Sequence, residues 1–298
     1  MGTFVQLVVN GLGKGAVYAL LALGFVIIFK ATEVVNFAHG SIALIGGYVI
    51  AVNVDNLGFP LAAAFGIAAA GLAALLIERL LISRSRLADP FALALLTIGV
   101  DVVVVEDVFR RLGTTVPYLG APWDARPIQV GGITFFSTQL VALGVGLVLI
   151  SAFFVAFKYT NWGVAMRAQA ENREAAALMG IRTSRVTATA WLVAGALAAV
   201  AVMFIVTQDF SGIGLSRSTH AIAFAAFPAA IIGGLDSTAG AVVGGVIVGL
   251  TEALSAEYLR DIVPNSFAFS KIAVFLVMLL VLIWRPSGLF GTRELTRV

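Results

Sequence analysis

The sequence contains no cysteine, which excludes disulfides and thiol chemistry and leaves its redox compartment undetermined. Charged residues make up only 12% of the chain, about half the share of a soluble domain, whose surface must be hydrated. Its two histidines, His39 and His220, occur without cysteine or an H-E-x-x-H pair, which argues against a catalytic metal site. The sequence also lacks a G-x-x-x-x-G-K-[ST] phosphate loop and a G-x-S-x-G nucleophile elbow. We therefore predict no enzymatic activity and no cofactor for this chain.

Long apolar runs dominate instead, since 60% of the 298 residues are hydrophobic and the mean hydropathy is +1.02. As a helix, such a run spans the ~30 Å hydrocarbon core of a bilayer and satisfies its own backbone hydrogen bonds there. We predict an all-α fold, a polytopic transmembrane helix bundle of about eight to ten spans, formed by residues 1–298 as one domain. The apolar segments are 5–29, 34–52, 60–82, 91–109, 138–157, 187–207, 219–232, 238–254 and 269–284.

The two short segments, 219–232 and 238–254, form either one broken element or two tilted helices, because Gly233, Gly234, Asp236 and Ser237 lie between them. Orientation follows from lysine and arginine, which favour the cytoplasmic side. If loop 158–186 is cytoplasmic, its side holds twelve of these residues and the other side holds six. The bias predicts a multi-pass protein with an outside N-terminus, a cytoplasmic C-terminus and a turn-rich outer loop at 110–137. The first ten residues begin a retained span rather than a signal peptide.

Loop 158–186 differs from the other loops, because it is rich in arginine and alanine and favours a helix. Good helix formers run through 164–179, and Gly180 is placed to end that helix in a left-handed conformation. The pattern of charged residues, then alanines, then Leu178 and Met179 predicts a short amphipathic helix outside the membrane. Such a helix either binds in a groove of a partner protein or lies on anionic lipid.

Several polar residues fall inside or beside the apolar segments. Glu33, Asn36 and His39 recur at helical spacing with Ser41 close by, so they either line a cavity or cap the second segment at the membrane surface. Lys14 and Asp101 lie deep in the first and fourth segments and either pair across helices or line an aqueous pathway. The polar and ionisable residues that could have a functional role in the membrane are therefore few and are scattered along the chain.

Glycines recur four residues apart at Gly11 and Gly15, at Gly240 and Gly244, and at Gly245 and Gly249. This spacing lets membrane helices approach closely. It predicts helix packing, or alternatively thin helices that line a path or slide during gating.

Five segments resemble the permeases of branched-chain amino-acid ABC importers, and among them the shorter of the two permease types. They are 15–20 (GAVYAL), 36–40 (NFAHG), 174–181 (EAAALMGI), 232–237 (IGGLDS) and 285–291 (RPSGLFG). Their order and spacing along the whole chain are more specific than any one of them. Three departures stand out: no I-x-L-P element follows the EAA segment, Asp101 replaces an expected small polar residue, and Ala239 replaces an expected proline.

The resemblance implies an importer subunit in a bacterial or archaeal cytoplasmic membrane. Its partners would be a second permease, identical or different, two cytoplasmic ATPases that bind Mg-ATP, and an extracytoplasmic substrate-binding protein, with no role for nucleic acid. The coupling segment to the ATPases would comprise Arg173, Glu174, Ala175, Ala176, Leu178, Met179 and Gly180. Our candidates for the pathway are Asn36, His39, Ser41, Asp101, Gly233, Gly234, Asp236 and Ser237.

Two alternatives concern the solute and its energy source. Members of this family carry other amino acids, urea, short amides and aromatic acids, and Asp101 is compatible with such a solute. From the residues alone, a secondary transporter driven by an ion gradient also fits, because Lys14, Glu33, Asp101 and Glu252 are ionisable residues at membrane depth.

Overall fold

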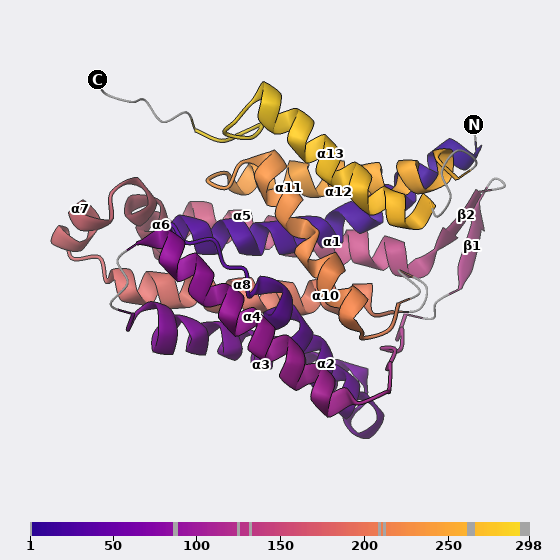
Figure 1. Cartoon of the computed structure of the whole chain (residues 1–298), viewed down its shortest axis with the longest axis horizontal. Coiled ribbons are helices and arrows are strands. Elements are labelled where there is room, and N and C mark those ends of the chain that lie inside the picture. The colour runs from indigo at the N-terminus through magenta and orange to yellow at the C-terminus, as the bar shows by residue number, and fades with distance from the viewer. Residues whose placement is uncertain are drawn as a thin grey trace.

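A computed structural model describes residues 2–85, 89–123, 126–130, 133–207, 210, 213–260 and 266–292. It is a bundle in which some helices run along the long dimension of the molecule and others lie obliquely to it (Figure 1). The helices are α1 (Gly2–Thr32), α2 (His39–Leu57), α3 (Phe59–Ile77) with the π-helical turn η1 (Glu78–Ile82), α4 (Pro90–Leu112), α5 (Ser137–Tyr159), α6 (Asn161–Glu171), α7 (Arg173–Leu178), α8 (Thr183–Ile205), α10 (Arg217–Phe224), α11 (Ala226–Gly233), α12 (Thr238–Tyr258) and α13 (Ser266–Trp284).

Every predicted apolar segment lies on helical structure, which confirms the all-α membrane bundle. Among the described residues, six helices are long and apolar enough to cross a membrane: α1 from Phe4, α2, α3 with η1, α5, α8 and α12. Helix α13 contributes a shorter apolar stretch, Phe269–Trp284. The chain is thus a multi-pass membrane protein.

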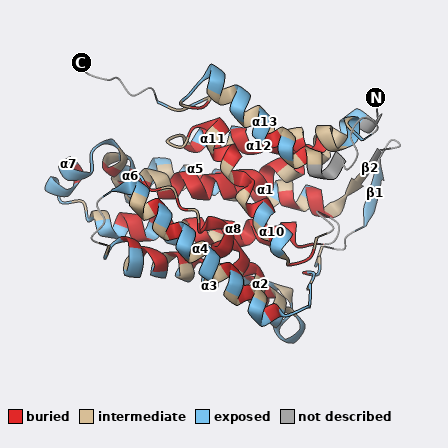
Figure 2. Ribbon diagram, viewed as in Figure 1, coloured by how far each residue is buried: buried red, intermediate tan, exposed pale blue. Residues whose placement is uncertain are grey.

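The distribution of buried and exposed residues is that of a protein surrounded by lipid rather than by water. Helices α1 and α8 form the interior, whereas α3, α4, α5 and α13 carry exposed outer faces (Figure 2). Those faces are apolar and include Phe65, Val103, Val148 and Leu280. Lipid tails are as apolar as leucine, so such a surface is stable in a bilayer without a polar coat.

Glycines bring α1 and α12 together at the centre of the bundle. A Cβ at Gly15 would lie 2.9 Å from Val246 Cα, and a Cβ at Gly11 would lie 3.1 Å from Leu250 Cα. A Cβ at Gly249 would meet the backbone of Gly11 and Gly15 at still shorter range. The four-residue glycine spacing therefore serves helix packing, as predicted.

The two ends of the bundle differ. At one end, where α1 begins, the strands β1 (Pro127–Val130) and β2 (Ile133–Phe136) form an antiparallel hairpin in which Pro127 pairs with Phe136 (Figure 1). This hairpin is an addition to the all-α prediction and lies in the predicted loop 110–137. Helix α7 and the C-terminal segment lie at the opposite end (Figure 1). We refer to these two ends of the bundle as the hairpin end and the α7 end.

Three predicted elements are divided more finely than expected. Segment 34–52 becomes helical only at His39, and segment 219–232 is split into α10 and α11 at Ala225. The predicted helix 164–179 is wrong as one element, because Asn172 adopts an extended backbone (φ −157°, ψ 106°) and separates α6 from α7. Helices α11 and α12 are separate elements that pack against each other across a turn at 234–237.

Candidate functional site

The polar residues near the start of α2 lie on a break between α1 and α2, not on one helix face as predicted. Residues 34–38 are non-helical, and Glu33 has a positive φ of 58°. Asn36 Oδ1 accepts a hydrogen bond of 3.1 Å from the Ala38 N–H, so it stabilises the turn just before α2. Ser41 Oγ donates to the Ala38 carbonyl at 2.9 Å. Asn36, His39 and Ser41 are all fully buried.

The His39 ring is enclosed by α1 and α8. Its ring centroid lies 4.5 Å from that of Phe25, and a Cβ at Gly24 would lie 2.6 Å from His39 Cε1. Neither ring nitrogen has a hydrogen-bond partner among the described residues, and the same is true of Asn36 Nδ2. A buried unpaired polar group is costly, so the three unpaired atoms of Asn36 and His39 reduce the stability of this break.

Aromatic rings connect this break to the break between α10 and α11. Phe37 lies 6.1 Å from Phe224 and 5.6 Å from Phe227, and Phe227 lies 5.6 Å from Phe25, all between ring centroids. His220 continues the cluster at 6.5 Å from Phe224. The break between α1 and α2 and the break between α10 and α11 therefore meet in one aromatic cluster.

Asp101 pairs with His220, not with Lys14. His220 Nε2 lies 3.0 Å from Asp101 Oδ1, which joins α10 to α4, and both side chains are about one-fifth exposed or less. Gly40 faces this histidine, because a Cβ there would lie 3.0 Å from His220 Cδ2. Of the two possibilities left open for Lys14 and Asp101, the pair between them does not form, since each has another partner.

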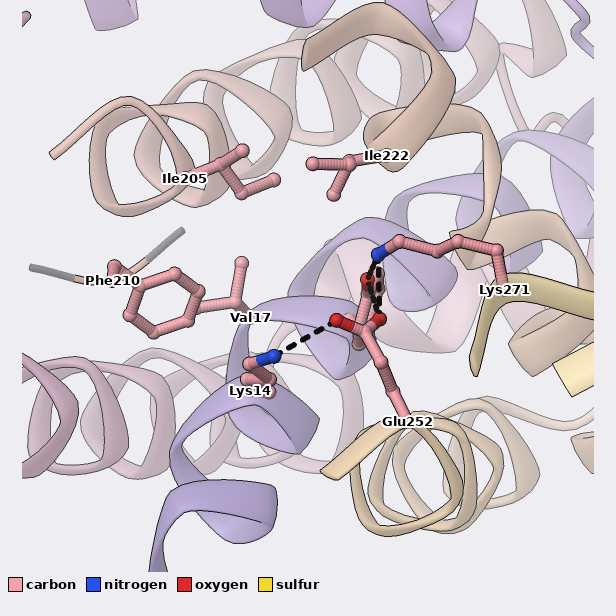
Figure 3. Close-up of a pocket in the computed structure, with 8 residues that line it drawn as sticks. Lys14, Val17, Ile205, Phe210, Ile222, Glu252 and Lys271 are labelled. Carbon is pink, nitrogen blue, oxygen red and sulfur yellow. Dashed lines mark hydrogen bonds and ion pairs between the residues drawn. The ribbon is translucent and has the colours of Figure 1, made fainter. Parts of the chain in front are cut away.

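Lys14 instead belongs to a polar cluster built by α1, α12 and α13 around Glu252 (Figure 3). Glu252 Oε1 accepts from Lys14 Nζ at 2.9 Å, and Glu252 Oε2 accepts from Lys271 Nζ at 2.8 Å and from the Tyr18 hydroxyl at 2.5 Å. These side chains line a cavity of about 60 Å³ that Ile205, Phe210 and Ile222 close from the opposite side (Figure 3). The helix-packing glycines lie on the same helices as Lys14 and Glu252.

The turn between α11 and α12 binds the C-terminal segment. Asp236 Oδ2 accepts from the Thr292 N–H at 2.8 Å, and the Leu289 and Phe290 N–H groups donate to the carbonyls of Ile232 and Gly233 at 2.8 and 2.9 Å. Gly234 has a φ of 105°. The Ser237 hydroxyl caps α12 by accepting from the Gly240 N–H at 3.0 Å.

The predicted pathway residues thus form two groups. Asn36, His39 and Ser41 lie in and after the α1–α2 break, with Asp101 close to it through His220 and Gly40. Gly233, Gly234, Asp236 and Ser237 form the turn at the α7 end. Lys30 connects that turn to α1 by donating to the Asp236 carbonyl at 2.7 Å.

The predicted coupling segment forms α7, which projects from the bundle (Figure 1). The Asn172 side chain caps it by accepting from the Ala175 N–H at 2.9 Å. At its other end Gly180 has a φ of 83°, and the N–H groups of Gly180 and Ile181 bond to the carbonyls of Ala177 and Ala176 at 3.0 Å. This is a Schellman motif, so the predicted left-handed end at Gly180 is confirmed.

Helix α7 buries little of its own surface. Only Ala176 is buried among Arg173–Leu178, whereas Leu178 is 88% and Met179 84% exposed. Helix α6 anchors the segment, since Gln169 Nε2 donates to the Ala31 carbonyl at 2.7 Å and to Thr187 Oγ1 at 3.0 Å. A firmly held loop therefore presents two large apolar side chains away from the bundle.

The prediction missed the cluster around Glu252, although Lys14 and Glu252 were recognised as ionisable residues at membrane depth. A signal for it was present in the sequence. Lys14 lies next to Gly15, and Glu252 follows Gly249 by three residues. Because glycine faces pack together, pairing these two faces places the lysine beside the glutamate. Nothing comparable in the sequence identified His220 as the partner of Asp101.

The geometry defines a class: a multi-pass helical membrane protein with buried polar clusters and a helix that projects from one end. Sequence and fold comparisons identify the family. Residues 7–282 match the family described as "Branched-chain amino acid transport system / permease component", and the chain belongs to it.

Individual relatives agree with this assignment. The chain is 29% identical over 310 residues to the high-affinity branched-chain amino acid transport system permease protein LivH of Escherichia coli (strain K12), covering 99% of this chain and 98% of that protein. It is 30% identical to a probable branched-chain amino acid transport permease protein LivH of Methanocaldococcus jannaschii, covering 91% and 88%. PsaBC from Streptococcus pneumoniae in complex with Fab has a similar fold, with a TM-score of 0.52, 13% identity and coverage of 93% and 90%.

Proposed function

We propose that this chain is the permease of an ABC importer that carries branched-chain or related small amino acids into the cytoplasm by alternating access. The observation that carries the proposal is α7, a capped helix outside the bundle that exposes Leu178 and Met179. A pair of large apolar side chains on a projecting helix is suited to a groove on another protein. Because the chain belongs to the permease family, we expect that groove to lie on the ATPase subunit.

The proposed assembly contains a second permease, two ATP-binding subunits that bind Mg-ATP, and an extracytoplasmic substrate-binding protein. It would lie in a bacterial or archaeal cytoplasmic membrane, with the α7 end and the C-terminus in the cytoplasm and the hairpin end outside. The two-to-one distribution of lysine and arginine supports this orientation. Residues 158–186 would be the coupling loop of one transmembrane domain, and the hairpin loop 110–137 would face the binding protein.

The structure weakens the motive for a carrier driven by an ion gradient. That alternative depended on four ionisable residues at membrane depth, and three of them, Lys14, Glu252 and Asp101, have an ion-pair or histidine partner within 3.0 Å. Uptake by the purified chain alone, driven by a proton or sodium gradient, would favour it. Uptake that requires the ATPases and ATP would favour the importer.

The coupling role is tested by reversing charge and removing apolar contact on α7. We expect Glu174→Lys and Leu178→Asp to reduce co-purification of the ATPases and ATP-dependent uptake in proteoliposomes by at least about tenfold, the equivalent of 1.4 kcal/mol of binding free energy. Glu257→Lys makes the same charge reversal at an exposed position of the hairpin end and should change neither.

Unchanged ATPase association and uptake in the α7 variants would contradict the coupling role. Intact ATPase association combined with weaker binding of the variants to anionic lipid would instead support α7 as an interfacial helix.

A further inference from the structure

We propose that the cavity beside Glu252 binds the carboxylate of the transported solute, and that the neighbouring groove between α10 and α13 holds its apolar side chain. The inference rests on the proposed function and narrows it. It selects amino acids with an apolar side chain over urea and amides.

The first argument concerns the charge presented to the cavity. Two lysines and one glutamate line it among the described residues. The side chain of Glu252 is only 5% exposed, whereas those of Lys14 and Lys271 are 21% and 25% exposed. The lysine side chains are therefore more accessible than the carboxylate that holds them in place. The Tyr18 hydroxyl adds a further polar group to the same wall.

The second argument concerns the adjoining groove. A cavity of about 420 Å³ lies between α10 and α13 and is lined largely by Ile213, Ala221, Ile222, Phe224 and Phe275. That volume falls within the range typical of small-molecule sites. Lys271 and Ile222 line both the groove and the smaller polar cavity. The polar cavity of about 60 Å³ and the larger apolar groove therefore share a wall that contains the Lys271 side chain.

A polar cavity beside an apolar groove matches the charged and the apolar halves of an aliphatic amino acid. A carboxylate would form charge-assisted hydrogen bonds with lysine, which are roughly twice as strong as neutral ones. Glu252 accepts from three described donors and is nearly inaccessible, so it holds the two lysines in place and does not bind the solute itself. Urea and amides lack the negative charge that the lysines favour.

The third argument is position. Glu252 lies six residues before the end of α12 and Lys271 five residues after the start of α13. At 1.5 Å per residue, both are about 8–9 Å inside the hairpin end. A solute delivered from that end would meet this cavity before reaching the aromatic cluster and the turn at 233–237.

Because the sequence contains no cysteine, a single cysteine introduced into it can be labelled without background from this chain. A cysteine replacing Ala221, which is exposed in the groove, is labelled with a membrane-impermeant maleimide in the complete transporter. Thr114→Cys, exposed in the loop at the hairpin end, is the control for effects on the reagent. At a solute concentration ten times Kd, we expect leucine to slow labelling at position 221 by roughly tenfold. Leucinamide and urea should not protect, and no solute should protect position 114.

Two substitutions connect protection to charge. We expect Lys271→Gln to abolish leucine protection and Lys271→Arg to retain it. If Lys271→Gln prevents assembly, the inference is still tested by comparing protection by leucine and by leucinamide at position 221 with Lys271 unchanged. Equal protection by leucine and leucinamide, or none by leucine while the transporter takes up leucine, would overturn the inference and leave the proposed function intact. Failure of the unsubstituted transporter to take up any amino acid would contradict the proposed function itself.

Discussion

The contact between α1 and α12 predicts a large effect from a single methyl group. In Gly15→Ala the new Cβ would lie 2.9 Å from Val246 Cα, whereas carbon atoms in contact are about 3.5–4.0 Å apart. The obstacle is backbone, so no side-chain rotation relieves it. The two helices must separate by roughly 1 Å, which forfeits a quarter to a half of each dispersion contact along the interface. Overpacking of this kind costs about 1–3 kcal/mol.

The same movement reaches the cluster around Glu252, because Lys14 precedes Gly15 and its ammonium group lies 2.9 Å from Glu252 Oε1. A separation of roughly 1 Å takes this pair beyond hydrogen-bond distance. We therefore expect Gly15→Ala to lower both the unfolding temperature and the transport rate.

The assay is thermal unfolding of the purified complex in one detergent, with Gly144→Ala in α5 as the matched control. A Cβ at Gly144 meets nothing within 4 Å, and alanine favours a helix by up to about 1 kcal/mol over glycine. The control should be neutral or slightly stabilised, and Gly15→Ala should unfold several degrees lower. Equal midpoints for the two variants would refute the close-packing argument.

Two further predictions concern the ends of the bundle. Gly180→Ala should weaken ATPase co-purification, because a φ of 83° costs about 1–2 kcal/mol for a residue with a Cβ; space is not the cause, since nothing lies within 4 Å of that Cβ. An unchanged ATPase yield would contradict it. Glu106→Gln should leave the unfolding midpoint nearly unchanged, although Glu106 and Arg217 pair at 2.7 Å, because both side chains are 61% exposed and exposed ion pairs contribute little to stability. A much larger shift, measured at low and high salt, would show that this pair stabilises the bundle.

The sequence predicted the helices better than their interruptions. Apolar run length is decided by the thickness of a bilayer, so the segments and the glycine-mediated packing followed from local pattern. The breaks at 33–38, Ala225 and Asn172 did not, because they depend on neighbours: Phe37 and Phe224 come together only in the folded bundle. Ion pairs were equally inaccessible. Lys14 and Glu252 are separated by 238 residues, and the sequence could not decide whether Lys14 pairs with Asp101, because two similar depths do not determine which helices are adjacent.

The separation between Lys14 and its partner has a consequence for biogenesis. Helix α1 leaves the ribosome before α12, because the carboxylate that neutralises its lysine is synthesised 238 residues later, after roughly 10–50 s of translation. Insertion scales put the cost of a lysine at the centre of a membrane helix at about 2.5–3.5 kcal/mol, and Lys14, which lies between the centre and the hairpin end, carries part of that cost. During that interval the nascent chain must keep Lys14 near water or beside the insertion machinery. Helix α1 is therefore completed only after α12 has been made, and a chain that ends before α12 would leave Lys14 in a membrane segment without its carboxylate partner.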